Sequence, residues 1–279
     1  MAAFLALFSS FLWGGADFFG GLLAKRYKSI AVTATSQFFG LILGAVLVLI
    51  TGTYIAPNFS WNGYLLPGIL AGACGLIGLV AFYAGLATGK MGVVSPISSL
   101  SALIPVTVAF LEGEKPSTQQ MIGMAIALMG AFFASGPELK GRITLQPIIY
   151  ALIALVGFGT ALTFLTQGSK TNPLLTMTTM RLTTVSICLV IALRIKVFGG
   201  FSKKDYPLIV LIGIADFLGN FLLGVATTKG LISLAIVLGS LFPIITSLLA
   251  FRFLHERLHK VQYLGIAQAI TGVVLISLA

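Results

Sequence analysis

Long apolar stretches alternate with short polar connections along the whole chain. Ten of these stretches have the length, roughly 20 residues, that a helix needs to cross a hydrocarbon layer about 30 Å thick. The connections carry nearly all of the charge and leave no room for a soluble domain. The pattern therefore predicts an all-α integral membrane protein with ten transmembrane helices. They are expected at residues 4–23, 30–52, 64–88, 92–111, 118–135, 146–167, 173–195, 206–227, 231–251 and 261–278.

Composition supports a membrane location. Hydrophobic residues make up 58% of the chain and charged residues only 9%, against about a quarter charged in soluble domains. The basic cluster Lys25, Arg26 and Lys28 follows the first apolar stretch instead of preceding it, so a retained helix is expected there and not a signal peptide. The two cysteines, Cys74 and Cys188, fall within predicted spans, which favours buried apolar residues and predicts neither a disulfide nor a metal site.

A set of four residues with fixed spacing occurs twice, once towards the end of each half of the chain. The copies are Glu114, Gln120, Gly123 and Gly130, then Glu256, Gln262, Gly265 and Gly272. Upstream, Pro105 corresponds to Pro243 at a different offset, which predicts four fewer residues in the first copy. Five spans per half is an odd number, so the second half must enter the membrane from the opposite side. The chain is therefore predicted to form two inverted five-helix repeats, at residues 1–136 and 146–279.

Loop charge gives an orientation. The net charge is +10, and thirteen Lys and Arg residues follow odd-numbered spans whereas three follow even-numbered spans. The positive-inside rule places the richer side in the cytoplasm, which leaves both termini outside the cytoplasmic membrane. The basic excess is thus interpreted as a topology signal, and as an attraction to membrane lipid, without a nucleic-acid partner.

The repeated combination of a membrane proline, a loop glutamate and a Gln-x-x-Gly-x6-Gly helix resembles the EamA repeat of the drug/metabolite transporter superfamily. The resemblance covers essentially the whole chain. It implies two inverted repeats around a central cavity and transport of small organic solutes such as amino acids, sugars, nucleotide-related metabolites or drug-like compounds. It also implies termini in the cytoplasm, opposite to the loop charge; we keep the charge rule. The expected partners are a solute and lipid, in a monomer or homodimer.

Three charged residues are expected inside the membrane, namely Asp17, Arg181 and Asp216. Such charges cost at least about 2.5 to 3.5 kcal/mol at a helix centre and usually face a cavity or a partner. Asn220 follows Asp216 by one turn and should share its helix face. One interpretation is that an aspartate exchanges a proton as substrate binds. The other is an ion pair of Arg181 with either aspartate that only lets buried charges coexist.

Arg181 has Gln37 as its counterpart in the first half, at an offset of about 144. Its planar guanidinium suits a carboxylate or phosphate ligand. The alternative is that the long side chain reaches back to the membrane edge. The aromatic candidates for a cavity wall, any of which could equally be a packing residue, are Trp13, Phe18, Phe19, Phe82, Tyr83, Phe158 and Phe164.

Other motifs point to structure more than to chemistry. Pro96, Pro105 and Pro243 are candidate kinks or a gate within the central spans. The loop residues Glu114 and Glu256 favour a helix cap or a loop ion pair over a catalytic role. The sequence contains no Gly-x-Ser-x-Gly or phosphate-loop motif, and an enzyme, a metal or a cofactor is not expected.

Together these features predict a secondary transporter that moves a small organic metabolite by alternating access. No nucleotide-binding segment is visible, so the energy would come from an ion gradient or from the solute gradient. Proton coupling through Asp216 is one form of the hypothesis. The alternatives are an uncoupled facilitator of the same fold and a membrane scaffold or receptor that does not transport.

Overall fold

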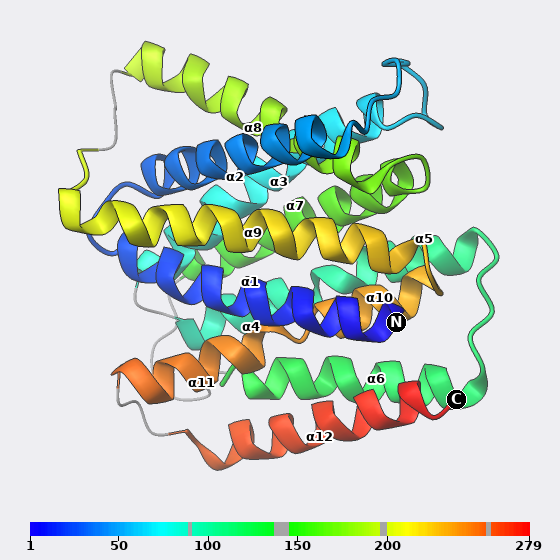
Figure 1. Cartoon of the computed structure of the whole chain (residues 1–279). Coiled ribbons are helices and arrows are strands. Elements are labelled where there is room, and N and C mark those ends of the chain that lie inside the picture. The colour runs from blue at the N-terminus through cyan, green and yellow to red at the C-terminus, as the bar shows by residue number, and fades with distance from the viewer. Residues whose placement is uncertain (89–90, 137–144, 196–199, 255–257) are drawn as a thin grey trace.

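The computed structural model describes residues 1–88, 91–136, 145–195, 200–254 and 258–279, and every regular element within them is helical (Figure 1). The elements are α1 Ala2–Ala24, α2 Ser29–Thr51, α3 Leu65–Ala87, α4 Met91–Ser99, η1 Leu100–Ala102, α5 Leu103–Leu111, α6 Thr118–Ala134, α7 Leu145–Ser169, α8 Pro173–Ile195, η2 Lys203–Asp205, α9 Tyr206–Thr227, α10 Ile232–Gly239, α11 Phe242–Leu254 and α12 Lys260–Ser277. In these residues nine segments are long and apolar enough to span a membrane, and α6 is a shorter apolar helix. The predicted all-α membrane fold is confirmed.

The fourth and ninth spans are each divided into two helical pieces. The first is interrupted between α4 and α5, and the second between α10 and α11 (Figure 1). A proline cannot donate a backbone hydrogen bond, and its ring clashes with the carbonyl four residues earlier. Counting back from Pro105 leads to Ser101 in η1, and counting back from Pro243 leads to Gly239, the last residue of α10. The prolines therefore account for the position of both interruptions.

The two halves pack against each other with their helices exchanged. The first helix of each half packs on the third helix of the other half, α1 on α9 and α7 on α3. The third helix of each half also packs on the second helix of the other half, α3 on α8 and α9 on α2. The helices α2 and α8, and likewise α6 and α12, pair with their own counterparts. The contacts make α1 antiparallel to α9 and α7 antiparallel to α3, with α2 parallel to α9 and antiparallel to α8. The first helices of the two repeats consequently run in opposite directions.

Packing corrects the offset predicted from the prolines. Gly14 of α1 lies against the carbonyl group of Phe242, and its equivalent Gly159 of α7 lies against the carbonyl group of Ser101. The two contacted residues are 141 positions apart, whereas the prolines are 138 apart. The predicted four-residue deficit is wrong, because the packing offset lies within one residue of the 142 that separates the copies of the motif. The two prolines therefore lie at slightly different positions along equivalent spans.

The glycines of the repeated motif form the crossing of α6 with α12. They are Gly123 and Gly130 in α6, and Gly265 and Gly272 in α12. A Cβ atom at Gly272 would lie 2.6 Å from the backbone nitrogen of Ala127, and one at Gly265 would overlap the backbone nitrogen of Ala134. Only a residue without a side chain permits backbones to approach this closely in lipid.

Capping fixes where these two helices begin. The Ser117 side chain accepts a hydrogen bond from the backbone N–H of Gln120, whose side-chain oxygen in turn accepts from the N–H of Ser117. At the start of α12, the side-chain oxygen of Gln262 likewise accepts a hydrogen bond from the backbone N–H of His259. Such caps satisfy backbone donors that the first turn of a helix leaves free. The motif glutamines therefore set the start of the crossing helices.

Both termini lie at the same end of the molecule (Figure 1). At the opposite end, the basic segment after α1 meets the start of α9, where Arg26 forms an ion pair with Asp205 and the Tyr27 hydroxyl donates a 2.6 Å hydrogen bond to the same carboxylate. Lys203 and Lys204 lie at this end too. Among the described residues, these basic side chains therefore lie at one end of the molecule, and the termini lie at the other.

Candidate functional site

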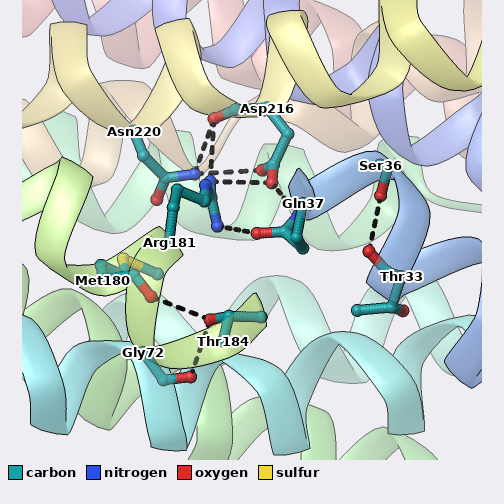
Figure 2. Close-up of polar contacts among 9 residues, drawn as sticks. All are labelled: Thr33, Ser36, Gln37, Gly72, Met180, Arg181, Thr184, Asp216 and Asn220. Carbon is teal, nitrogen blue, oxygen red and sulfur yellow. Dashed lines mark hydrogen bonds and ion pairs between the residues drawn. The ribbon is translucent and has the colours of Figure 1, made fainter. Parts of the chain in front are cut away.

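A network of four polar side chains links the second helix of one half to the second and third helices of the other. Figure 2 shows Gln37 of α2, Arg181 of α8, and Asp216 with Asn220 of α9 directed towards one another. The Arg181 guanidinium forms a 2.8 Å ion pair with Asp216 Oδ2, and it donates hydrogen bonds to the backbone carbonyl of Asp216 at 3.4 Å and to Gln37 Oε1. Gln37 Nε2 donates to Asp216 Oδ2 at 2.7 Å, and Asn220 Nδ2 donates to Asp216 Oδ1 at 3.0 Å. Both carboxylate oxygens are therefore satisfied.

The charged side chains of Arg181 and Asp216 are largely buried, so each needs the other as a counter-ion. The Arg181 side chain is 3% exposed and the Asp216 side chain 15%. Taking an isolated charge out of water costs several kcal/mol, and only a well-placed counter-ion with further hydrogen bonds offsets that cost. Of the two ion pairs considered from sequence, Arg181 with Asp216 or with Asp17, the structure forms the first.

Gln37 and Arg181 occupy equivalent positions in the two halves and touch each other. Their contact therefore lies where α2 crosses its own counterpart α8. Arg181 does not reach the membrane edge. Its Nε atom has no hydrogen-bond partner among the residues that the structure describes, and it faces Gly40, where a Cβ atom would lie 3.5 Å away. The arginine is held in the interior by its terminal nitrogens.

The network lines a cavity between the helices. Its walls contain several pairs of structurally equivalent residues, one from each half. These include Trp13 with Phe158, Gln37 with Arg181, and Ser101 with Phe242. The cavity thus lies between the repeats, where inverted-repeat transporters place their substrate sites.

Charge breaks this symmetry. The cavity-lining Asp17, Arg181 and Asp216 have as counterparts Leu162, Gln37 and Gly75, none of which is charged. The two halves therefore share a backbone architecture around the cavity, but their side chains at equivalent positions differ in charge. Both aspartates and the arginine come from helices α1, α9 and α8, which meet at the cavity.

Asp17 differs from the other two charged residues. It lines the cavity, yet it makes no hydrogen bond or ion pair within the described parts of the chain. Trp13 lies one turn earlier on the same helix and also lines the cavity, with its ring edge-on to Phe242 at a centroid distance of 6.3 Å. The structure thus brings Asp17 and Trp13 to the same site as the Arg181 network.

Tyr83 occupies a different position from the one predicted for a wall residue. Its ring is buried among core residues, with its hydroxyl beside Gly20 of α1, and it is not among the residues that line the cavity. Phe158, in contrast, contributes to the wall. Sequence alone could not separate the two because an apolar helix gives aromatic residues the same local pattern whether they face a core or a cavity.

Several wall residues have no distinguishing sequence signal. Ser101, Thr184 and Phe242 line the cavity. The Thr184 hydroxyl donates to the carbonyl of Gly72 at 3.1 Å and to that of Met180 at 3.0 Å, which ties α8 to α3 (Figure 2). The packing offset of 141 relates Phe242 to Ser101, but the proline offset hides this relation.

The motif residue Glu114 lies away from the cavity lining. The Glu114 carboxylate accepts the backbone N–H groups of Ile232 and Ser233, the latter at 3.0 Å, at the beginning of α10. It thus caps a helix of the opposite half, where a negative charge also complements the helix dipole. Glu256 lies outside the described residues.

The three prolines predicted as kinks or a gate lie within the two broken spans. Pro96 lies inside α4, Pro105 near the start of α5, and Pro243 near the start of α11. Of the cavity residues, Ser101 lies in η1 between α4 and α5, and Phe242 is the first residue of α11. Irregular backbone inside a membrane is tolerated where it borders a cavity or is buried in protein.

Comparison with known proteins agrees with this arrangement. A model of the EamA-like transporter family matches residues 1–136 and again residues 145–278. The uncharacterized protein MJ1333.1 of Methanocaldococcus jannaschii is 30% identical over 132 residues, which cover 47% of this chain and 96% of that protein. A solved crystal structure has a TM-score of 0.80 at 15% sequence identity, covers 99% of this chain and 96% of its own, and so shows the same fold.

Proposed function

This chain belongs to the EamA-like transporter family, and from that premise we propose that it is a secondary transporter that binds a small organic solute in the cavity between its halves. Transport of small solutes across a membrane, without enzymatic chemistry, follows from the family. The proposal adds the location of the solute site, alternating access across the cytoplasmic membrane, and energy from an ion or solute gradient.

One observation carries the proposal: the polar network of Gln37, Arg181, Asp216 and Asn220 lines a cavity where the two inverted halves meet. Intramembrane charges are costly, and a pair retained beside a cavity points to a solute pathway. Rocking of one half against the other would expose such a central site to each side in turn.

The ends of the molecule supply contacts that such a motion would have to break. On the side of the termini, Glu114 caps α10 of the other half. On the other side, Arg26 and Tyr27 bind Asp205. These contacts join segments from different halves, so opening either end would require one set of them to separate.

The test is solute binding followed by transport. A metabolite panel is screened by the thermal stabilisation of the purified protein, because a ligand that favours the folded state raises its apparent stability. Compounds that stabilise it are then assayed for uptake into proteoliposomes. We expect Asp216→Asn to abolish the stabilisation and to reduce uptake at least ten-fold, because Arg181 loses its counter-ion. Asn220→Ala, which leaves every charge in place, should weaken both less.

Glu112→Gln is the matched control, because this carboxylate lies in an exposed loop pair. It should bind and transport as the wild type does. Uptake driven by an imposed pH gradient would identify proton coupling, and uptake that only equilibrates the solute would identify a facilitator. A well-folded wild-type protein that takes up none of the panel but retains a partner protein on gentle extraction would contradict the proposal in favour of a scaffold.

A further inference from the structure

The three charges of the cavity do not balance. Arg181 and Asp216 form a 2.8 Å ion pair, and the Asp216 carboxylate also accepts hydrogen bonds from Gln37 and Asn220. Asp17 lines the same cavity without a hydrogen bond or an ion pair to any residue that the structure describes. With all three groups ionised, the site carries one negative charge in excess.

The lining around Asp17 provides no second cation. Arg181 is the positively charged residue among the residues that line the cavity, and its terminal nitrogens are held by Asp216 and Gln37. Moving Arg181 to Asp17 would leave Asp216 unpaired, which would only transfer the excess charge. A carboxylate taken out of water without a partner is costly, so the charge of Asp17 is balanced either by a proton or by a cation that comes from outside the protein.

Aromatic rings of both halves surround the same space. Trp13, Phe158 and Phe242 line the cavity, and the rings of Trp13 and Phe242 meet edge-on. The face of an aromatic ring attracts a cation, most strongly for Trp, and the attraction increases where water is excluded. Leu76, Leu79 and Leu162 supply apolar wall. This combination suits a molecule with one cationic group on an apolar or aromatic body.

We propose that the cavity binds small organic monocations, protonated amines with an apolar or aromatic body, and that Asp17 is the counter-ion of the ammonium group. The proposal rests on the transporter function above and names its substrate class. An anion would meet the unpaired Asp17 and find Arg181 already occupied. A neutral analogue would leave the Asp17 carboxylate unpaired in the cavity.

The protein carries a built-in reporter for the test. It has two tryptophans, of which Trp13 lines the cavity and Trp61 lies in an exposed loop. Trp61→Phe keeps the backbone carbonyl that accepts from Gln167, and leaves Trp13 as the single fluorophore. In this background, 2-phenylethylammonium, 2-phenylethanol and 3-phenylpropanoate are titrated against the full chain in detergent. The three probes share a phenyl body and differ in charge.

We expect saturable quenching by the cation at a concentration at least ten-fold below that needed for the alcohol, and none by the anion. Asp17→Asn should weaken cation binding at least ten-fold and leave binding of the alcohol unchanged. Asp17→Glu should retain the preference for the cation, whereas Glu112→Gln, in the loop, should behave as the parent protein. The Asp17→Asn variant keeps the Arg181–Asp216 pair, and its folding is checked by its thermal transition.

Equal affinity of the cation for Asp17→Asn and the parent protein would overturn the proposal, as would equal affinity of the parent for cation and alcohol. Saturable quenching by the alcohol or the anion without a preference for the cation would refute the substrate class and leave the solute site standing. Absence of quenching by all three probes would also reject the substrate class, and the uptake panel would then decide the transporter function separately.

Discussion

At the scale of single residues, the site depends on one position that differs between two equivalent helices. Arg181 and Gln37 are counterparts in the inverted halves, and they contact both each other and Asp216. The glutamine donates a hydrogen bond to the carboxylate, and the arginine neutralises it. Because the two side chains reach the same oxygen, the structure offers two places from which a guanidinium could pair with Asp216.

This geometry predicts that exchanging the two residues restores what a single substitution removes. Arg181→Gln leaves Asp216 without a counter-ion and should destabilise the protein by about 3 to 5 kcal/mol, the usual cost of breaking a buried pair. The double variant Gln37→Arg with Arg181→Gln should recover at least half of the loss. Thermal unfolding in detergent measures both. Equal stabilities of the single and double variants would show that the guanidinium works only from α8.

At the scale of the elements, close helix crossings hold the two halves together. The glycines of the repeated motif let α6 and α12 approach at backbone distance, and the motif glutamines cap the same two helices. The motif that identifies the repeats therefore builds a crossing away from the cavity. Its regularity reflects the pairing of α6 with its own counterpart, since the close contacts of the glycines on one helix recur on the other.

A methyl group at this crossing should be costly, whereas the same change on a free face should not. Gly265→Ala places a Cβ atom on the backbone of Ala134, which cannot move aside as a side chain could. We expect a loss of about 1 to 3 kcal/mol from overpacking. Gly15→Ala in α1 meets nothing within 4 Å and should be neutral or stabilising, because alanine favours the helix. Melting temperatures of the two variants provide the comparison.

At the scale of the whole molecule, charge distinguishes the two ends. The segment after α1 and the residues before α9 gather basic side chains at one end, and both termini lie at the other (Figure 1). Short basic loops are retained in the cytoplasm. The fold is consistent with either orientation because an inverted pair of repeats has related architecture on both sides, so the charges alone provide the orientation.

The positive-inside rule predicts that a cysteine at the end with the termini reacts with a membrane-impermeant maleimide added to intact cells, and that one at the basic end does not. Lys115 and Lys204 are exposed at these two ends. Each is replaced by Cys in a background where Cys74 and Cys188 are Ala. Labelling of Lys115→Cys alone is expected, with both positions reacting after the membrane is made permeable. Labelling of Lys204→Cys alone would place the termini inside.

Much of the candidate site could be read from the chain, because intramembrane charge is rare. Asp17, Arg181 and Asp216 are conspicuous in apolar stretches, and the repeat offset indicated Gln37. The choice of partner could not be read. Asp216 and Asp17 are alike as sequence, and only the meeting of α8 with α9 gives one of them the arginine. Tyr83 and Phe158 show the same limit, since they differ only in what their helices face.

Sequence by itself determined that the chain lies in a lipid bilayer, how many spans it has, and that it consists of two repeats, because the length of apolar stretches and a repeated motif are local properties. An odd number of spans in each half then required inversion. Tertiary structure decided the register between the halves, which helices of one half pack on which helices of the other, and that Asp17 has no partner among the described residues. These depend on contacts between residues more than a hundred positions apart, and an apolar helix presents no polar face that would reveal them in advance.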